Sequence, residues 1–224
     1  TARESPRAPA RALGFQYLIG LDFPDAARKL ARVGSQGLAI LSRDEATSDG
    51  VQALRILPIA YNNAFQLERG EQLPPGVGTI GFDSVWRESI PDYRHPAWQE
   101  RRIREAIAAA VMGFGGVMLD NGDRSEGRRA AADFVRKMIA RVRAETGKSQ
   151  FCAILQNGQE LARAHPWLIT GGYVGALQQE DISYRVNDGG NGTGERVPDD
   201  EREEIDEAFR VIRARHPTLP LISV

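Results

Sequence analysis

The chain has 224 residues, 42% hydrophobic and 26% charged, so it can bury one large core and fits one α/β domain better than two. Its 29 basic and 30 acidic residues are interspersed and give a formal net charge of −1, which argues against a nucleic-acid partner. No apolar run approaches the roughly 20 residues that span a bilayer, and a single cysteine, Cys152, excludes a disulfide within the chain.

The first 14 residues are rich in arginine and proline and lack the apolar core of a secretory signal. We expect residues 1–14 to form a flexible arm and residues 15–224 to form one domain.

The next part of the chain alternates between strand and helix patterns. Residues 15–22 form an apolar run that ends in an acid, and a helical pattern follows over residues 25–34. Residues 37–41 and 55–61 predict a second and a third strand. Pro58 weakens the third prediction, because proline cannot donate a hydrogen bond to a strand ladder.

Residues 65–95 form a connection that is long for a compact domain, is rich in proline and glycine, and includes Trp86 and Tyr93. Long connections of this kind are often functional.

The second half of the chain repeats the alternation of helices and strands. Its predicted elements are a helix over residues 96–114, a strand over 117–119, a helix over 125–147, a strand over 150–155, a short helix over 159–168, a strand over 173–177, a helix with an acidic first turn over 198–215 and a strand over 219–224.

Residues 187–195 hold four glycines and predict a loop, which we expect to be a mobile flap beside the binding groove. The segment lacks the Lys-Ser/Thr pair of a phosphate-binding loop and does not run directly from a strand into a helix. It therefore gives little support to a nucleotide site.

This rhythm, with polar residues at the strand ends, predicts an α/β fold of the (β/α) TIM-barrel type. An open doubly wound sheet is the alternative. Seven strands are readable, whereas a complete eight-fold barrel typically takes about 250 residues. Either this barrel ends early, or the 224 residues are part of a longer chain.

The stretch over residues 115–123 is the most informative, because an apolar strand pattern ends abruptly at Asp120. In α/β sheets and barrels, ligands bind at the carboxyl ends of such strands. The same Asp-Asn-Gly-Asp sequence also suits an ordinary turn.

Other catalytic chemistries have less support. Each of the three histidines directly precedes a proline, which places it at an element boundary, and Cys152 lies in the middle of a predicted strand. No GxSxG motif is present. The fifth strand ends in Gln156 and Asn157 rather than in carboxylates, so a metal site is a minority interpretation.

Asp120 and Glu180, at the ends of the fourth and sixth strands, form the pair of carboxylates that glycosidic bond cleavage needs. Amides both donate and accept hydrogen bonds, as sugar hydroxyls do, and the nearby ones are Asn121, Gln156, Asn157, Gln178 and Gln179. Three aromatic residues suit sugar rings as well as internal packing: Trp86, Tyr93 and Tyr184. We expect five side chains to share one rim: Asp22, Tyr61, Asp120, Asn157 and Glu180.

At these residues the chain resembles glycoside hydrolase family 114, the endo-α-1,4-polygalactosaminidase-like barrels, and related hydrolase domains of bacterial exopolysaccharide systems. The matching segments are GVMLDN at 116–121, QNGQEL at 156–161, QEDISY at 179–184, Tyr61 and YRHPAW at 93–98. Their order and spacing cover most of residues 15–224.

The resemblance implies hydrolysis of an α-1,4-linked galactosamine or N-acetylgalactosamine polysaccharide without metal or organic cofactor, by a secreted or periplasmic protein. It implies that Asp120 is the nucleophile and Glu180 the acid/base, with carboxyl groups roughly 5 to 5.5 Å apart if the enzyme retains configuration. The predicted substrate contacts are Asp22, Tyr61, Asn121, Gln156, Asn157 and Tyr184. The alternative is a carbohydrate-binding or regulatory barrel without turnover.

Overall fold

The computed structural model describes residues 14–18, 21–31, 37–68, 70–84, 87–125, 127–180, 184–186, 194–196 and 198–223. The predicted N-terminal arm up to residue 13, Trp86 and residues 187–193 of the predicted flap lie outside these ranges. Gly194 and Glu195, predicted to belong to that flap, lie in the short strand β10 (Gly194–Arg196), which pairs with β9 (Tyr184–Val186).

Seven parallel strands form the central sheet, and their spatial order follows the chain. The strands in that order are β1 (Gly14–Leu18), β2 (Gly37–Leu41), β3 (Leu57–Asn62), β6 (Gly116–Leu119), β7 (Cys152–Gln156), β8 (Val174–Gln179) and β11 (Leu221–Ser223). A doubly wound sheet reverses its strand order at a switch point. This sheet does not, so the predicted barrel-type fold is confirmed and the doubly wound alternative is wrong.

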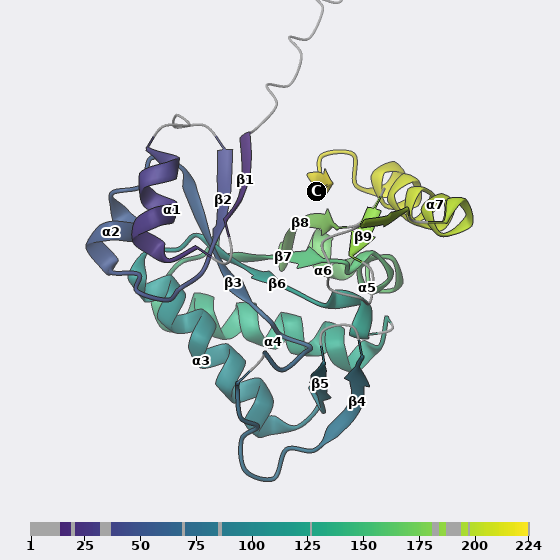
Figure 1. Ribbon diagram of the computed structural model, residues 1–224, viewed down its shortest axis with the longest axis horizontal. Coiled ribbons are helices and arrows are strands. Elements are labelled where there is room, and N and C mark those ends of the chain that lie inside the picture. Colours follow the sequence, from purple (N-terminus) through teal and green to yellow (C-terminus); the bar gives the residue numbers. More distant parts are fainter. Residues whose placement is uncertain are drawn as a thin grey trace, which may run out of the picture.

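Helices cover the outside of the sheet, which curls into a half-barrel (Figure 1). They are α1 (Phe23–Leu30), α2 (Ser48–Gln52), α3 (Pro96–Met112), α4 (Arg129–Thr146), α5 (Gln159–Ala164), α6 (Trp167–Thr170) and α7 (Asp199–Arg215), with a 3-10 turn η1 at Gly122–Ser125. None of the helices in the described ranges is both long and apolar enough to cross a membrane.

The two faces of the sheet have separate apolar clusters. Alternate residues such as Leu119 and Leu155 face outward and pack with the buried side of α3 and α4 in the main core. The residues between them face inward and form a smaller cluster of Ile40, Ile59, Met118, Ile154 and Ala176. The inside of the curled sheet is therefore filled by side chains at this level.

Local sequence signals mark both ends of α3 and the C-terminal end of α4. Pro96 opens α3, whose preceding residue His95 accepts a hydrogen bond from the Ala97 N–H, and the main chain leaves the helix at Gly113. Gly147 ends α4 in the left-handed conformation, with a φ of 71°. Both boundaries agree with the sequence pattern.

Pro58 lies inside β3, opposite Ala39 of β2, so its presence did not break the strand. Its carbonyl accepts a hydrogen bond from the Gly115 N–H. The N–H and C=O of one residue point to the same neighbour, so the missing donor faces the chain just before β6 begins at Gly116. No ladder hydrogen bond is lost there.

The long connection after β3 contains a hairpin that sequence patterns did not predict, formed by β4 (Thr79–Asp83) and β5 (Glu88–Pro91). Asp83 is buried and forms an ion pair with Arg124 of η1. The hairpin is thereby attached to the turn that directly follows Asp120.

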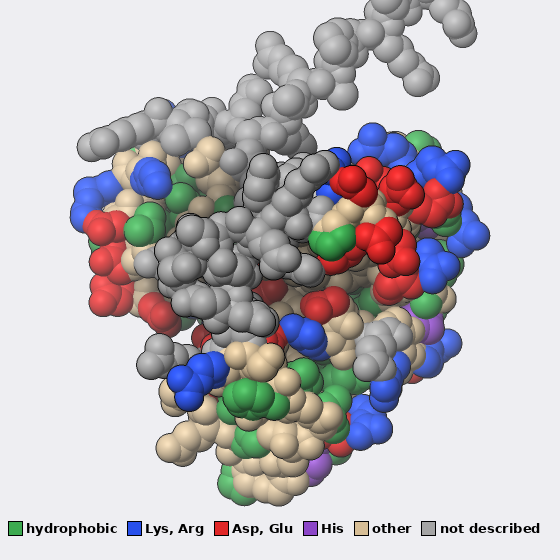
Figure 2. Space-filling model, turned by 45° about the vertical axis from the view of Figure 1, so that its right-hand side comes forward, with side chains coloured by type: hydrophobic (Ala, Val, Ile, Leu, Met, Phe, Trp, Pro, Cys, Tyr) green, Lys and Arg blue, Asp and Glu red, His purple; other side chains and the backbone are tan. Residues whose placement is uncertain are grey.

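α7 carries acidic side chains at its start, where Asp199, Asp200 and Glu201 suit the positive end of the helix dipole, as predicted. Figure 2 shows acidic side chains gathered on this part of the surface. The helix packs against α5 through its buried Ile205, Ala208 and Ile212 side.

Candidate active site

A polar layer lies on the inner face of the sheet, towards the carboxyl ends of the strands. Tyr61, Asp120, Gln156 and Gln178 each come two residues after a member of the inner apolar cluster, so they point the same way. Tyr17 of β1 joins them, and its hydroxyl donates to Gln156 Oε1 at 3.1 Å. Three strands separate β1 from β7 in the sheet, so this hydrogen bond crosses the inside of the curl.

Asp120 directly follows β6 and uses both carboxylate oxygens. Tyr61 Oη donates to Oδ2 at 2.6 Å, and the Asn121 N–H donates to Oδ1 at 2.6 Å. Burial raises the pKa of Asp120 to about 6, and the negative charge of Glu180 acts in the same direction, while the hydrogen bonds from Tyr61 and Asn121 oppose the rise. The Asp120 carboxyl therefore titrates in the weakly acidic range.

Glu180 follows β8 and faces the same space. Burial raises the pKa of the Tyr17 hydroxyl, and the charges of Glu180 and then Asp120 raise it further. Burial likewise raises the pKa of Tyr61, followed by the charge of Asp120. Two tyrosines and two carboxylates thus share one electrostatic environment, as the shared rim predicted for Tyr61, Asp120 and Glu180 requires.

The segments that carry the two carboxylates are fixed by asparagines. Asn121 and Asn157 adopt left-handed backbone conformations, with φ of 58° and 53°, directly after β6 and β7. Asn121 Nδ2 donates to Asn63 Oδ1 at 3.0 Å, and Asn157 Oδ1 accepts the Glu180 N–H at 3.0 Å. Both side chains were predicted to bind substrate, and the hydrogen bonds described here give them a positioning role.

The two turns also contact each other through their glycines. A Cβ atom built on Gly122 would lie 2.7 Å from the Gln156 carbonyl oxygen and 2.7 Å from the Gly158 Cα. Only glycine at position 122 allows the turn after Asp120 to approach the turn after Gln156 so closely.

From outside the sheet, an ionic network supports the end of β3. The Asp120 N–H donates to the Asn62 carbonyl at 3.0 Å, and Asn62 Nδ2 contacts Glu105 Oε2 at 3.4 Å. Glu105 in turn pairs with the buried Arg102 at 2.9 Å, whose guanidinium stacks over Trp98. The backbone that carries Tyr61 and Asp120 is therefore tied to α3.

Comparisons with known proteins agree with this architecture. No protein-family model matches the chain, and no curated protein matches its sequence. Among solved structures, the glycoside hydrolase domain of PelA from Pseudomonas aeruginosa is similar, with a TM-score of 0.67 and 18% identity over 95% of this chain and 83% of that one. The chain shares its fold with that domain.

Two further solved structures share this fold. Ega3 from Aspergillus fumigatus, in complex with galactosamine, matches with a TM-score of 0.62 and 13% identity over 99% of this chain and 80% of that one. The α-galactosidase TtGalA from Thermus thermophilus, in complex with stachyose, matches with a TM-score of 0.55 and 13% identity over 97% of this chain and 62% of that one.

Three other residues that were predicted to contact substrate or a sugar ring lie outside the polar layer or outside the described residues. Asp22 starts α1 as its N-cap, where Oδ1 accepts the Asp25 N–H at 2.8 Å, so its carboxylate stabilises the helix end. Tyr93 is 1% exposed and packs edge-on against Phe65, which rules out a sugar-stacking role. The side chain of Tyr184 lies outside the described residues.

Tyr17 is the member of the layer that the sequence did not single out. The sequence evidence for a functional role of Tyr17 was weak, because an aromatic residue in an apolar strand usually indicates packing in the core. Only the curl of the sheet brings β1 across from β7 and makes this hydroxyl part of the layer.

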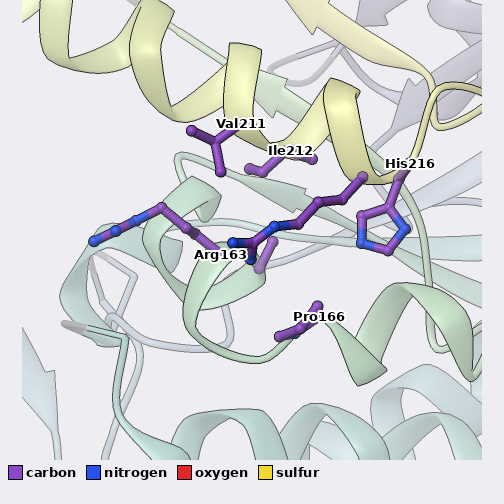
Figure 3. Close-up of a pocket in the computed structure, with 7 residues that line it drawn as sticks. Arg163, Pro166, Val211, Ile212 and His216 are labelled. Atoms are coloured by element: carbon purple, nitrogen blue, oxygen red, sulfur yellow. The ribbon is translucent and has the colours of Figure 1, made fainter.

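Two further features are not alternative active sites. Within the described ranges, no group of three or more His, Cys, Asp or Glu side chains is placed to hold a metal ion. A shallow depression between α5 and α7 is lined by Ala162, Arg163, Pro166, Val211, Ile212, Arg215 and His216 (Figure 3). It contains no carboxylate and shares no residue with the Asp120 and Glu180 layer.

Proposed function

We propose that this protein is a glycoside hydrolase that cleaves a galactosamine-containing polysaccharide, with Asp120 and Glu180 as its carboxylate pair. The observation that carries the proposal is the partly buried Asp120 carboxyl, whose pKa is raised to about 6 by desolvation and by the charge of Glu180 and which is held by Tyr61 and Asn121. Oriented carboxylates with shifted pKa values are typical of catalytic groups.

The choice of substrate rests on two further points of support. The segments around Asp120, Gln156 and Glu180 resemble those of the endo-α-1,4-polygalactosaminidase-like barrels. The similar Ega3 structure contains galactosamine.

The mechanism that the family resemblance implies is a double displacement with retention of configuration. Asp120, ionised and aligned by its two hydrogen bonds, attacks the anomeric carbon while Glu180 protonates the departing glycosidic oxygen. Glu180, now ionised, then removes a proton from a water molecule that attacks the glycosyl ester, which releases Asp120 and returns Glu180 to its protonated form.

Substitution of each carboxylate by its amide tests the proposal. Asp120→Asn and Glu180→Gln should each lower turnover of an α-1,4-galactosaminan by about 10²- to 10⁴-fold, because each removes one ionisable group and keeps the size of the side chain. The matched controls are Asp133→Asn and Glu160→Gln, two surface carboxylates on α4 and α5 that pair with Arg129 and Arg163. Both controls should keep wild-type rates.

The readouts are reducing-end formation, the anomer of the first product by NMR, and circular dichroism to check folding. Wild-type rates in either amide variant would remove that residue from the mechanism. Inversion at the anomeric carbon would assign Asp120 as a base rather than a nucleophile. A wild-type protein that binds the polymer without cleaving it would be a carbohydrate-binding barrel.

A further inference from the structure

Gln178 stands out in the polar layer because its side chain has no hydrogen-bond partner among the described residues. The residue is 1% exposed, and both its Oε1 and its Nε2 are buried without a partner. A buried carboxamide that has given up its hydrogen bonds to water carries a free-energy penalty unless another group replaces them.

The surroundings of Gln178 explain why the protein itself leaves the group unpaired. Its register neighbour on β7 is Gln156, whose Oε1 already accepts the Tyr17 hydroxyl. On its other side, Ile222 of β11 offers no polar side chain. Below it on the same face lies Ala176 of the apolar cluster, and two residues further along the chain is Glu180.

We propose that Gln178 is a specificity-determining residue that hydrogen-bonds a hydroxyl or amino group of the sugar ring held between Asp120 and Glu180. The inference rests on the proposed glycoside hydrolase function. Gln178 lies two residues after Ala176, as Asp120 lies two residues after Met118, so both side chains face the inside of the curled sheet. A bound sugar there would supply the hydrogen-bond partners that the fold does not.

The chemistry of the carboxamide indicates which ligands it can accept. It offers one acceptor oxygen and two N–H donors, which match a pair of neighbouring ring substituents that both donate and accept. A sugar that lacks one of them leaves the buried amide unpaired in the complex, so Gln178 selects against deoxy analogues.

The test replaces Gln178 by methionine, which has nearly the same length and no strong hydrogen-bonding group. Gln178→Met should keep or raise the melting temperature, since it removes an unpaired buried amide, and should raise KM for galactosamine oligosaccharides at least about tenfold. Gln66→Met is the control: Gln66 is also 1% exposed, but its Nε2 donates to Glu88 Oε2 at 2.8 Å on the outer side of the sheet. That variant should melt earlier and keep kcat/KM within about twofold of the wild-type value.

A second measurement separates recognition from folding. Wild-type protein should discriminate between a galactosamine oligosaccharide and its monodeoxy analogues, and Gln178→Met should lose that discrimination at one ring position. An unchanged KM together with unchanged discrimination would overturn the inference. So would a fall in melting temperature that accounts for the lost activity.

Failure of the proposed function gives a different result. If the wild-type protein cleaves no galactosaminan, the role of Gln178 is tested by calorimetry alone. The measurement compares the affinity of the wild type and of Gln178→Met for galactosamine oligosaccharides. A roughly tenfold weaker affinity in the variant supports the role of Gln178 without catalysis. Equal affinity, or no binding to the wild type, overturns it.

Discussion

Asp120 lies in surroundings that push its pKa in opposite directions. Burial and the charge of Glu180 disfavour the carboxylate, whereas the hydrogen bonds from Tyr61 and Asn121 favour it. The balance sets a pKa of about 6, so the group loses its proton in the weakly acidic range and is ionised at neutral pH. Activity that needs an ionised Asp120 should therefore decline below this pH.

Tyr61→Phe should move the acid limb of the kcat/KM profile to higher pH by about one unit, because it removes a hydrogen bond that favours the ionised carboxyl. The measurement is kcat/KM from pH 4 to 8 on a galactosaminan. Tyr173→Phe, at an aromatic contact with Trp167 on the outside of the sheet, should leave the limb in place. A limb that moves to lower pH in Tyr61→Phe would contradict the assigned role of the hydroxyl.

The same group links stability to pH. The pKa of Asp120 is raised in the folded state, so its contribution to stability is fully present below the unfolded value of about 3.9 and is lost as pH rises through about 6. Asp120→Asn cannot lose this contribution. Between pH 4 and pH 7 the free energy of unfolding of the wild type should therefore fall by about 2 kcal/mol relative to that of the variant.

Urea unfolding of both proteins at pH 4 and pH 7 measures this difference. The comparison across pH cancels the effect of the changed hydrogen bonds, which is the same at both values. A stability difference that does not depend on pH would mean that Asp120 titrates normally in the folded protein.

At the scale of elements, two neighbouring strands end in the same way. Asp120-Asn121-Gly122 follows β6, and Gln156-Asn157-Gly158 ends β7, each with its asparagine in a left-handed conformation. The contact at Gly122 joins the two turns, and Asn157 then holds the backbone of Glu180. The relative position of the two carboxylates therefore depends on this contact.

Gly122→Ala should destabilise the protein by roughly 1 to 3 kcal/mol, because the new methyl group meets backbone atoms that cannot move aside alone. It should also lower kcat/KM at least about tenfold, since small displacements of catalytic groups are costly. Gly78→Ala is the control, because its Cβ would have no atom within 4 Å. Thermal denaturation and kinetics below the melting transition give both values, and a destabilised variant with full activity would show that the site tolerates separation of the turns.

Sequence patterns predicted some elements better than others, for physical reasons. The long helices were predicted from the helical period of their buried face, and the strands from short unbroken apolar runs, because both faces of the sheet are covered. The β4–β5 hairpin was missed because most of β4 is exposed, which leaves little apolar alternation to detect. The third strand was predicted correctly despite Pro58, because a proline is tolerated where its missing donor faces no strand carbonyl.

At the scale of the whole molecule, the strand order and the positions of Asp120 and Glu180 at strand ends were predictable. A chain that alternates repeatedly between strands and helices can form a parallel sheet in only a few topologies. The pKa of Asp120, the hydrogen bonds that occupy Asn121 and Asn157, and the place of Tyr17 were not predictable. They depend on how far the sheet curls, which brings side chains together that are distant in the sequence.

The hydrogen bond between Tyr17 and Gln156 spans 139 positions of the chain, which has a consequence for synthesis on the ribosome. At about 5 to 20 residues per second, roughly 7 to 28 seconds pass between the translation of these two residues. Through that interval the emerging chain has β1 without its partner across the curl, and Glu180 is translated later still. Assembly of the polar layer is thus a late event of biosynthesis, and a ribosome that stalls before β7 carries a nascent chain without a site.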